Sequence, residues 1–376
     1  MPGRELPPRH KMRTVNAIPT HTSASTSARE FSQAKISGLP FDWLMILLSL
    51  VFVGGLFLDG WAHNHGKVDQ TFFTPWHAFF YAGFFLTAAA LVGAVLLNWR
   101  RGFSLAAAIP DGYRSSVAGV VVFAVGGVGD LVWHTTFSIE DGIEALFSPT
   151  HLLLGIGLLL IVTGPLSAGW MTGGRNCRWH IVAPAFLSTC LLTSILTFFM
   201  LVSHPVTQMI AGSSQRHFNN DVGVVAGMLG LLVTSGQMIG IVLLLLRRWQ
   251  LRPGSLTLIW GLNTVAMTII DYEVPLQLWL GGGMLVGAIF SDLLLLWLHP
   301  SVERPGRLRL FATAGPMLLI GGFFAAMISS EGTSWSIHLW SGSIVLAGLL
   351  GLLLSYLVAP PALPKSDGVE FDQTAN

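Results

Sequence analysis

Long apolar segments recur along almost the whole chain, and each is long enough to cross a lipid bilayer. A helix needs roughly 20 residues to span a hydrocarbon core about 30 Å thick. Because that core offers no water to the backbone, each segment must be helical. The sequence therefore predicts an all-α integral membrane protein with about ten transmembrane helices, placed near 41–62, 72–99, 116–138, 148–170, 181–203, 222–246, 255–274, 276–298, 309–330 and 337–358.

The composition excludes a cytosolic globular enzyme. Charged residues make up only 10% of the chain and hydrophobic residues 52%, whereas soluble domains carry about 25% charged residues. The net charge of +1 leaves no basic excess to neutralise phosphates, so nucleic acid is not expected as a partner and membrane lipid is. Two cysteines are too few for a disulfide scaffold or a thiolate metal cage.

The distribution of lysine and arginine predicts the orientation. With ten spans, all but two of the 20 lysines and arginines fall on one side, and the exceptions are Lys67 and Arg216. Positive residues favour the cytoplasmic side. We therefore predict that both termini are cytoplasmic and that the chain lies in a plasma or inner membrane. The polar segments 1–38 and 359–376 are predicted to be disordered cytoplasmic tails.

With this topology, most histidines and many carboxylates fall at the extracytoplasmic ends of the spans. An ionisable group in a bilayer is costly unless it is partnered, so this clustering indicates mutual partners or a metal. We predict that residues 39–170 form a metal-binding four-helix region with two repeated hairpins, and that 171–358 add further transmembrane helices. Asp271 and Glu273 are weaker candidates for carrying protons or binding a cation, or simply mark the end of a span.

The two hairpins carry one motif, D-x-x-x-H followed by F-[ST]-P-x-H. A spacing of four residues places the aspartate and the first histidine on one helical face. The Thr or Ser fits an N-cap and the proline fits the first helical position, so the second histidine lies in the first turn of the next helix. Each hairpin is thus expected to bring one carboxylate and two imidazoles together: Asp59, His63 and His77 in the first, and Asp130, His134 and His151 in the second.

Two histidines and one carboxylate with open positions form a ligand set for iron, zinc or copper. The alternative is a hydrogen-bonded Asp–His pair that only satisfies buried polar groups, or a proton relay. The repetition favours the metal site. Glu140 and Glu144 lie in the loop of the second hairpin, where they are candidates for accepting hydrogen bonds from ligand histidines. The aromatic residues around the motifs either wall an apolar pocket or form an interfacial belt.

These motifs resemble the transmembrane copper-binding subunit of the copper membrane monooxygenases, the particulate methane and ammonia monooxygenases. The resemblance covers residues 59 to 157 and includes the F-T-P-x-H segment with a Phe-Tyr pair after it. It implies that Asp59, His63 and His77 are ligands of the principal copper, and that His134 and His151 are ligands of a second. Asp130 stands where the family has asparagine, which implies a more anionic second site.

The resemblance implies an oxygen-dependent oxidoreductase that acts on ammonia or a small hydrocarbon. Such an enzyme needs electrons, so additional monooxygenase subunits or a quinol are implied as partners. Two alternatives stay open. One is a membrane protein that binds or transfers copper without oxidising a substrate. The other is a haem protein, with His77 and His151, or His63 and His134, as axial ligands.

Overall fold

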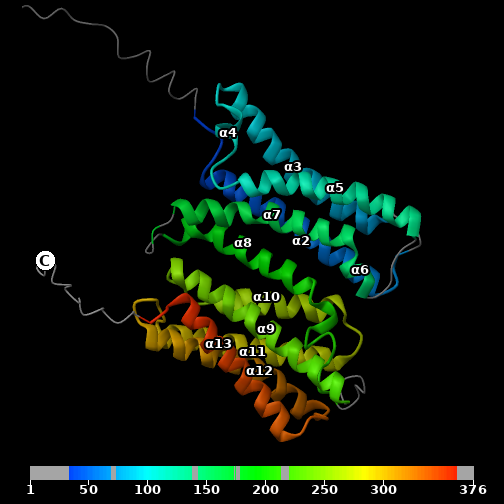
Figure 1. Cartoon of the computed structure of the whole chain (residues 1–376), viewed down its shortest axis with the longest axis vertical. Coiled ribbons are helices and arrows are strands. Elements are labelled where there is room, and N and C mark those ends of the chain that lie inside the picture. Colours follow the sequence, from blue (N-terminus) through cyan, green and yellow to red (C-terminus); the bar gives the residue numbers. More distant parts are fainter. Residues whose placement is uncertain are drawn as a thin grey trace, which may run out of the picture.

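The computed structural model describes residues 34–68, 73–137, 143–172, 174, 178–212 and 220–361. In these ranges the chain forms helices and two isolated β-bridges but no strand, which confirms the predicted all-α class. Most of the two predicted tails, residues 1–33 and 362–376, lies outside the described residues. Figure 1 shows the helices packed side by side, in two sets along the long axis of the molecule.

The first set holds α2 (Leu39–Asn64), α3 (Pro75–Arg100), α4 (Leu105–Ala108), α5 (Arg114–Phe137), α6 (Ile143–Phe147), α7 (Pro149–Thr172) and α8 (Trp179–Phe198). The 3-10 turn η1 (Leu201–Ser203) leads to the second set, α9 (Asp221–Arg248), α10 (Ser255–Ile270), α11 (Pro275–Leu298), α12 (Pro305–Ser330) and α13 (Ile337–Val358). Among the described residues, nine helices are long and apolar enough to cross a membrane. The multi-pass character predicted from sequence is therefore confirmed.

Helix α10 has only 16 residues, a length of about 24 Å, shorter than the hydrocarbon core. It nevertheless runs between the same two ends of the bundle as its neighbours. Asn64, the last residue of α2, donates a hydrogen bond to the Ile270 carbonyl at one end of α10 (3.2 Å). At the opposite end, the Arg248 guanidinium before α10 donates to the Trp170 carbonyl near the end of α7 (2.8 Å). This path agrees with a tenth crossing; the orientation of the termini stays a prediction.

The two hairpins α2–α3 and α5–α7 are packed by the same glycine contact. A Cβ atom on Gly83 would lie 2.7 Å from Cα of Phe52, and one on Gly157 would lie 2.8 Å from Cα of Phe123. Both glycines lie six residues after the second histidine of their hairpin, and both phenylalanines lie seven residues before the aspartate. The Phe52 and Phe123 rings touch, with centroids 5.0 Å apart. The duplication therefore extends from the motif to the helix packing.

The end of the bundle away from the motifs is fixed by polar contacts. Asn98 of α3 accepts a hydrogen bond from the Ile36 amide (2.7 Å) and donates to the Ile36 carbonyl (3.1 Å). Lys35 pairs with Asp111 at 2.7 Å. Residues 34–38, predicted from sequence to belong to the N-terminal tail, are thus held against the first set of helices.

Helix α8 joins the two sets, because it packs against α2 and α7 on one side and α10 on the other. From sequence it was predicted to belong to the second region, after residue 171. Its end at Phe198 reaches the same end of the bundle as the two motifs, where its side chains contact α2. The helices that surround the motifs are therefore α2, α3, α5, α7 and α8.

Candidate metal centre

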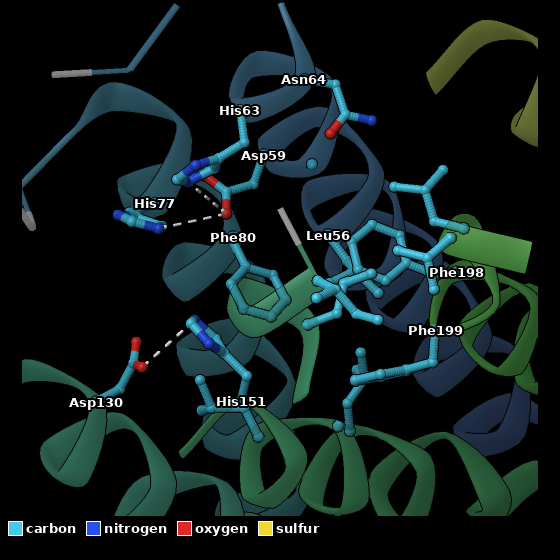
Figure 2. Close-up of a pocket in the computed structure, with 18 of the residues that line it drawn as sticks. Leu56, Asp59, His63, Asn64, His77, Phe80, Asp130, His151, Phe198 and Phe199 are labelled. Atoms are coloured by element: carbon cyan, nitrogen blue, oxygen red, sulfur yellow. Dashed lines mark ion pairs between the residues drawn. The ribbon is translucent and has the colours of Figure 1, made fainter. Parts of the chain in front are cut away.

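The first group consists of Asp59, His63 and His77. Asp59 and His63 lie in the last turns of α2, and His77 lies in the first turn of α3. The Asp59 carboxylate oxygen Oδ2 is 3.4 Å from Nε2 of His77 and 4.0 Å from Nε2 of His63. The two imidazole rings have centroids 5.5 Å apart. Figure 2 shows the three side chains turned toward one another.

The second group consists of Asp130, His134 and His151, from the end of α5 and the start of α7. Oδ1 of Asp130 is 3.4 Å from Nε2 of both histidines, whose ring centroids are 5.5 Å apart. In each group one donor atom from every residue lies within 4.8 Å of the others, close enough to hold a metal ion. The predicted meeting of one carboxylate and two imidazoles in each hairpin is confirmed.

The predicted N-caps place the second histidine of each group. The Thr74 hydroxyl accepts a hydrogen bond from the His77 amide (3.1 Å). The Ser148 hydroxyl accepts one from the His151 amide (3.4 Å) and also lies 2.7 Å from the ring nitrogen Nδ1 of His151. A proline starts the helix directly after each cap, where it lacks the amide that would otherwise need a partner. The caps therefore fix the positions of both histidines in the first turns of α3 and α7.

Both groups open onto one cavity of about 320 Å³. Phe80 lines the cavity together with both groups, and Figure 2 shows its ring beside them. The rest of the wall is mainly apolar and comes from α2, α6, α7, α8 and the segment after α8. It includes Leu56, Ile143, Leu146, Leu154, Leu158, Phe198, Phe199, Leu201 and Val202. Of the aromatic residues around the motifs, Phe80 and Tyr81 line this cavity, whereas Phe73, Phe79, Phe137 and Phe147 are exposed.

The two predicted glutamate partners have different outcomes. Glu140 lies outside the described residues. Glu144 is on α6 with its side chain exposed, and it does not line the cavity, whereas Ile143 and Leu146 of the same helix do. Its role as a hydrogen-bond acceptor for a ligand histidine stays a prediction.

Several residues of the site have no role that was predicted from sequence. The hydroxyls of Tyr81 and Thr150 both donate to the Asp130 carboxylate, at 3.5 Å and 3.0 Å. Phe198 and Phe199 come from the end of α8, whose sequence has no part in the repeated motif. Only the position of Tyr81 one turn after His77 gave a signal, since residues four apart share a helical face.

Asp271, directly after α10, brings a carboxylate from the second set of helices to the cavity. Burial raises the pKa of Asp271 to about 6, repulsion from Glu273 acts in the same direction, and His65 opposes both. Because the folded pKa exceeds the ordinary value of 3.8, ionisation of this carboxyl costs folding free energy as the pH rises from about 4 to 6.

Asp271→Asn should therefore raise the melting temperature of the protein above pH 6, by about 2 °C, and leave it unchanged near pH 4. Asp111→Asn is the control, and its effect on the melting temperature should have the opposite sign, because a hydrogen bond from Lys35 holds the pKa of Asp111 below its usual range. Thermal unfolding in detergent across this pH range measures both. A constant offset between Asp271→Asn and the wild type at every pH would contradict the assignment.

Comparisons with protein-family models, curated proteins and solved structures find no match to this chain. The resemblance of its motifs to the copper membrane monooxygenases therefore stays a prediction. The proposed function accordingly depends on the geometry of the two groups and of the cavity between them.

Proposed function

We propose that this protein is a copper-dependent membrane oxidoreductase that uses dioxygen to oxidise a small apolar molecule or ammonia. One observation carries the proposal. Two Asp-His-His groups at corresponding places of two hairpins face a single cavity of about 320 Å³ whose remaining wall is mainly apolar. A proton relay or a structural Asp–His hydrogen bond requires neither two such groups nor an apolar cavity beside them.

The donor atoms fit a metal ion. Two imidazoles and one carboxylate leave coordination positions open, as metals that react with a substrate require. Oδ1 of Asp59 is buried and has no hydrogen-bond partner in the described part of the chain, and such an atom costs free energy unless a cation or donor satisfies it. Imidazole suits copper, iron and zinc alike; the resemblance of the motifs favours copper.

The residues of the chain have separate tasks in this proposal. The two groups hold the cations at the end of the bundle, and bound copper supplies one-electron redox chemistry with dioxygen. Leu154, Leu158, Phe198 and Phe199 exclude water and receive an apolar molecule from the bilayer. Phe198 and Leu158 are almost fully buried, so this side of the chamber has a fixed shape.

Hydroxylation of a C–H or N–H bond in this way consumes one dioxygen, two electrons and two protons. One oxygen atom enters the substrate and the other leaves as water. The electrons must come from outside the chain, and we propose a quinol in the bilayer or an additional subunit as the donor. A quinol supplies both the electrons and the protons when it is oxidised to quinone.

The haem alternative is not favoured by the geometry. It pairs His77 with His151 or His63 with His134, whereas the two rings of each hairpin lie close together, with centroids 5.5 Å apart. Copper binding without oxidation remains the competing function, and the experiment that tests the proposal separates the two.

Purified protein reconstituted in lipid nanodiscs with copper and a reduced quinol should consume dioxygen when ammonia or a short alkane is added. The hydroxylated product should appear in a one-to-one ratio with the dioxygen consumed. Full copper binding with no substrate-dependent oxygen uptake, even with the membrane fraction added back, would favour the carrier function instead.

The proposal also predicts how the chamber limits substrate size. Phe199 lines the cavity and is only half-buried, so Phe199→Ala should enlarge the chamber without strong destabilisation. We expect the preference for longer over shorter alkanes to rise by about tenfold, because pocket fit discriminates by this order. Phe79→Ala, on an exposed face of α3, is the control. Equal loss of activity toward all alkanes would contradict this role.

A further inference from the structure

Among the positions at which the two hairpins differ, two determine the contacts of an aspartate. The residue before the second histidine is Trp76 in the first hairpin and Thr150 in the second. The residue four positions after that histidine is Tyr81 in the first and Gly155 in the second. Two of these four residues, Tyr81 and Thr150, donate a hydrogen bond to an aspartate, and in both cases it is Asp130.

Tyr81 belongs to the helix of the first group but reaches the second. It lies one turn after His77 on α3, and its hydroxyl donates to Oδ2 of Asp130 on α5 (3.5 Å). Gly127 of α5 leaves room for the ring, because a Cβ atom there would lie 3.0 Å from a ring carbon of Tyr81.

Thr150 holds the other oxygen of the same carboxylate. Its hydroxyl donates to Oδ1 of Asp130 at 3.0 Å, and Oδ1 is also the oxygen that faces both histidines of the second group. Asp130 is buried, with 2% of its surface exposed. Both of its oxygens are therefore engaged by hydroxyl groups, from two different helices.

Asp59 has a different environment. Its Oδ2 faces the histidines of the first group, but its Oδ1 is buried and accepts no hydrogen bond from any residue that the structure describes. Trp76, which occupies the place of Thr150, instead donates its indole N–H to the Lys67 carbonyl (3.1 Å). The first group thus has a carboxylate with one unused oxygen, whereas the carboxylate of the second group is held on both sides.

We propose that Tyr81 and Thr150 are positioning residues that fix the Asp130 carboxylate, so that the two groups bind metal unequally. The inference rests on the proposed metal binding. Asp59 can offer both oxygens to a cation, and Asp130 offers one in a fixed direction. Hydrogen bonds that orient a ligand of a metal contribute about 10-fold to 100-fold to its affinity. Tyr81, although it stands beside His77, therefore affects the second site and not the first.

The test measures copper affinity and the Cu(II) EPR spectrum of each group separately. Asp59→Ala leaves the second group for measurement, and Asp130→Ala leaves the first. In the Asp59→Ala protein, Thr150→Val and Tyr81→Phe should each weaken copper binding by about tenfold or more and change the EPR spectrum. In the Asp130→Ala protein, Tyr81→Phe should change neither.

Two further variants separate positioning from a general structural role. Thr150→Ser keeps the hydroxyl and should restore the affinity and the spectrum that Thr150→Val loses. Tyr356→Phe, on α13, should have no effect on either group. The inference is overturned if Tyr81→Phe weakens the first group as much as the second, or if Thr150→Val and Tyr81→Phe leave the second unchanged. A wild-type protein that binds no copper would overturn the proposed function as well.

Discussion

Alanine in place of His77 is expected to remove one equivalent of copper from the protein and to lower the affinity of the first group by at least about 100-fold. His77 is 8% exposed, and its Nε2 lies 3.4 Å from the Asp59 carboxylate, so under the proposed function its removal would take a buried ligand away from the cation. Asp59→Ala should have the same effect. Copper content after equilibration with a competing chelator measures the loss.

His180→Ala is the matched control, because His180 is an exposed histidine near the start of α8, at the other end of the bundle. Its copper content should equal that of the wild type. Near-ultraviolet circular dichroism checks that His77→Ala retains its tertiary structure. Wild-type copper content in both His77→Ala and Asp59→Ala would refute the assignment of the first group.

A valine at Gly83 is expected to destabilise the protein by about 3 kcal/mol and to weaken copper binding at the first group by about tenfold. The added Cβ would lie 2.7 Å from a backbone atom of Phe52, so α3 must move away from α2 and carry His77 with it. Gly157→Val should do the same to the second group through Phe123. Thermal unfolding and copper affinity measure the two effects.

Gly93→Val tests whether the close approach, rather than the loss of a glycine, is responsible. Gly93 lies on the same helix as Gly83, but a Cβ atom there meets no described residue within 4 Å. This variant should retain both stability and copper binding. Equal destabilisation by Gly83→Val and Gly93→Val would mean that the helix contact does not hold the first group in place.

The predictable part of the fold is the part that a bilayer dictates. A long apolar segment in a bilayer must form a helix, because its backbone polar groups have to be satisfied internally. The positions of most spans therefore follow from the sequence. The length of α10 does not, because the helix ends at Ile270, whose carbonyl accepts a hydrogen bond from Asn64 at the end of α2. The Gln277 side chain also bonds to the backbone of residues 271, 273 and 274 after the helix, and an apolar pattern encodes neither contact.

The meeting of the Asp and His side chains in each hairpin was predictable because their spacing is local. His63 lies four positions after Asp59, and the cap at Thr74 places His77 in the first turn of the next helix. The role of Tyr81 was not predictable, because it depends on how the two hairpins pack against each other. The role of Thr150 depends on the packing of α7 against α5 within the second hairpin. The part of the apolar wall that comes from the end of α8 was not predictable either, because it depends on the packing of α8, and α8 lies outside the two repeated hairpins.

The most direct test of metal binding by the two groups is the Cu(II) EPR spectrum of the copper-loaded protein, recorded with detection of nitrogen coupling. We predict coupling to imidazole nitrogens in the wild type and the loss or reduction of this coupling in a variant that lacks both His77 and His151, because that variant keeps only one imidazole in each group. A copper signal without imidazole coupling, or a spectrum that the double substitution leaves unchanged, would contradict the claim that the two Asp-His-His groups hold metal.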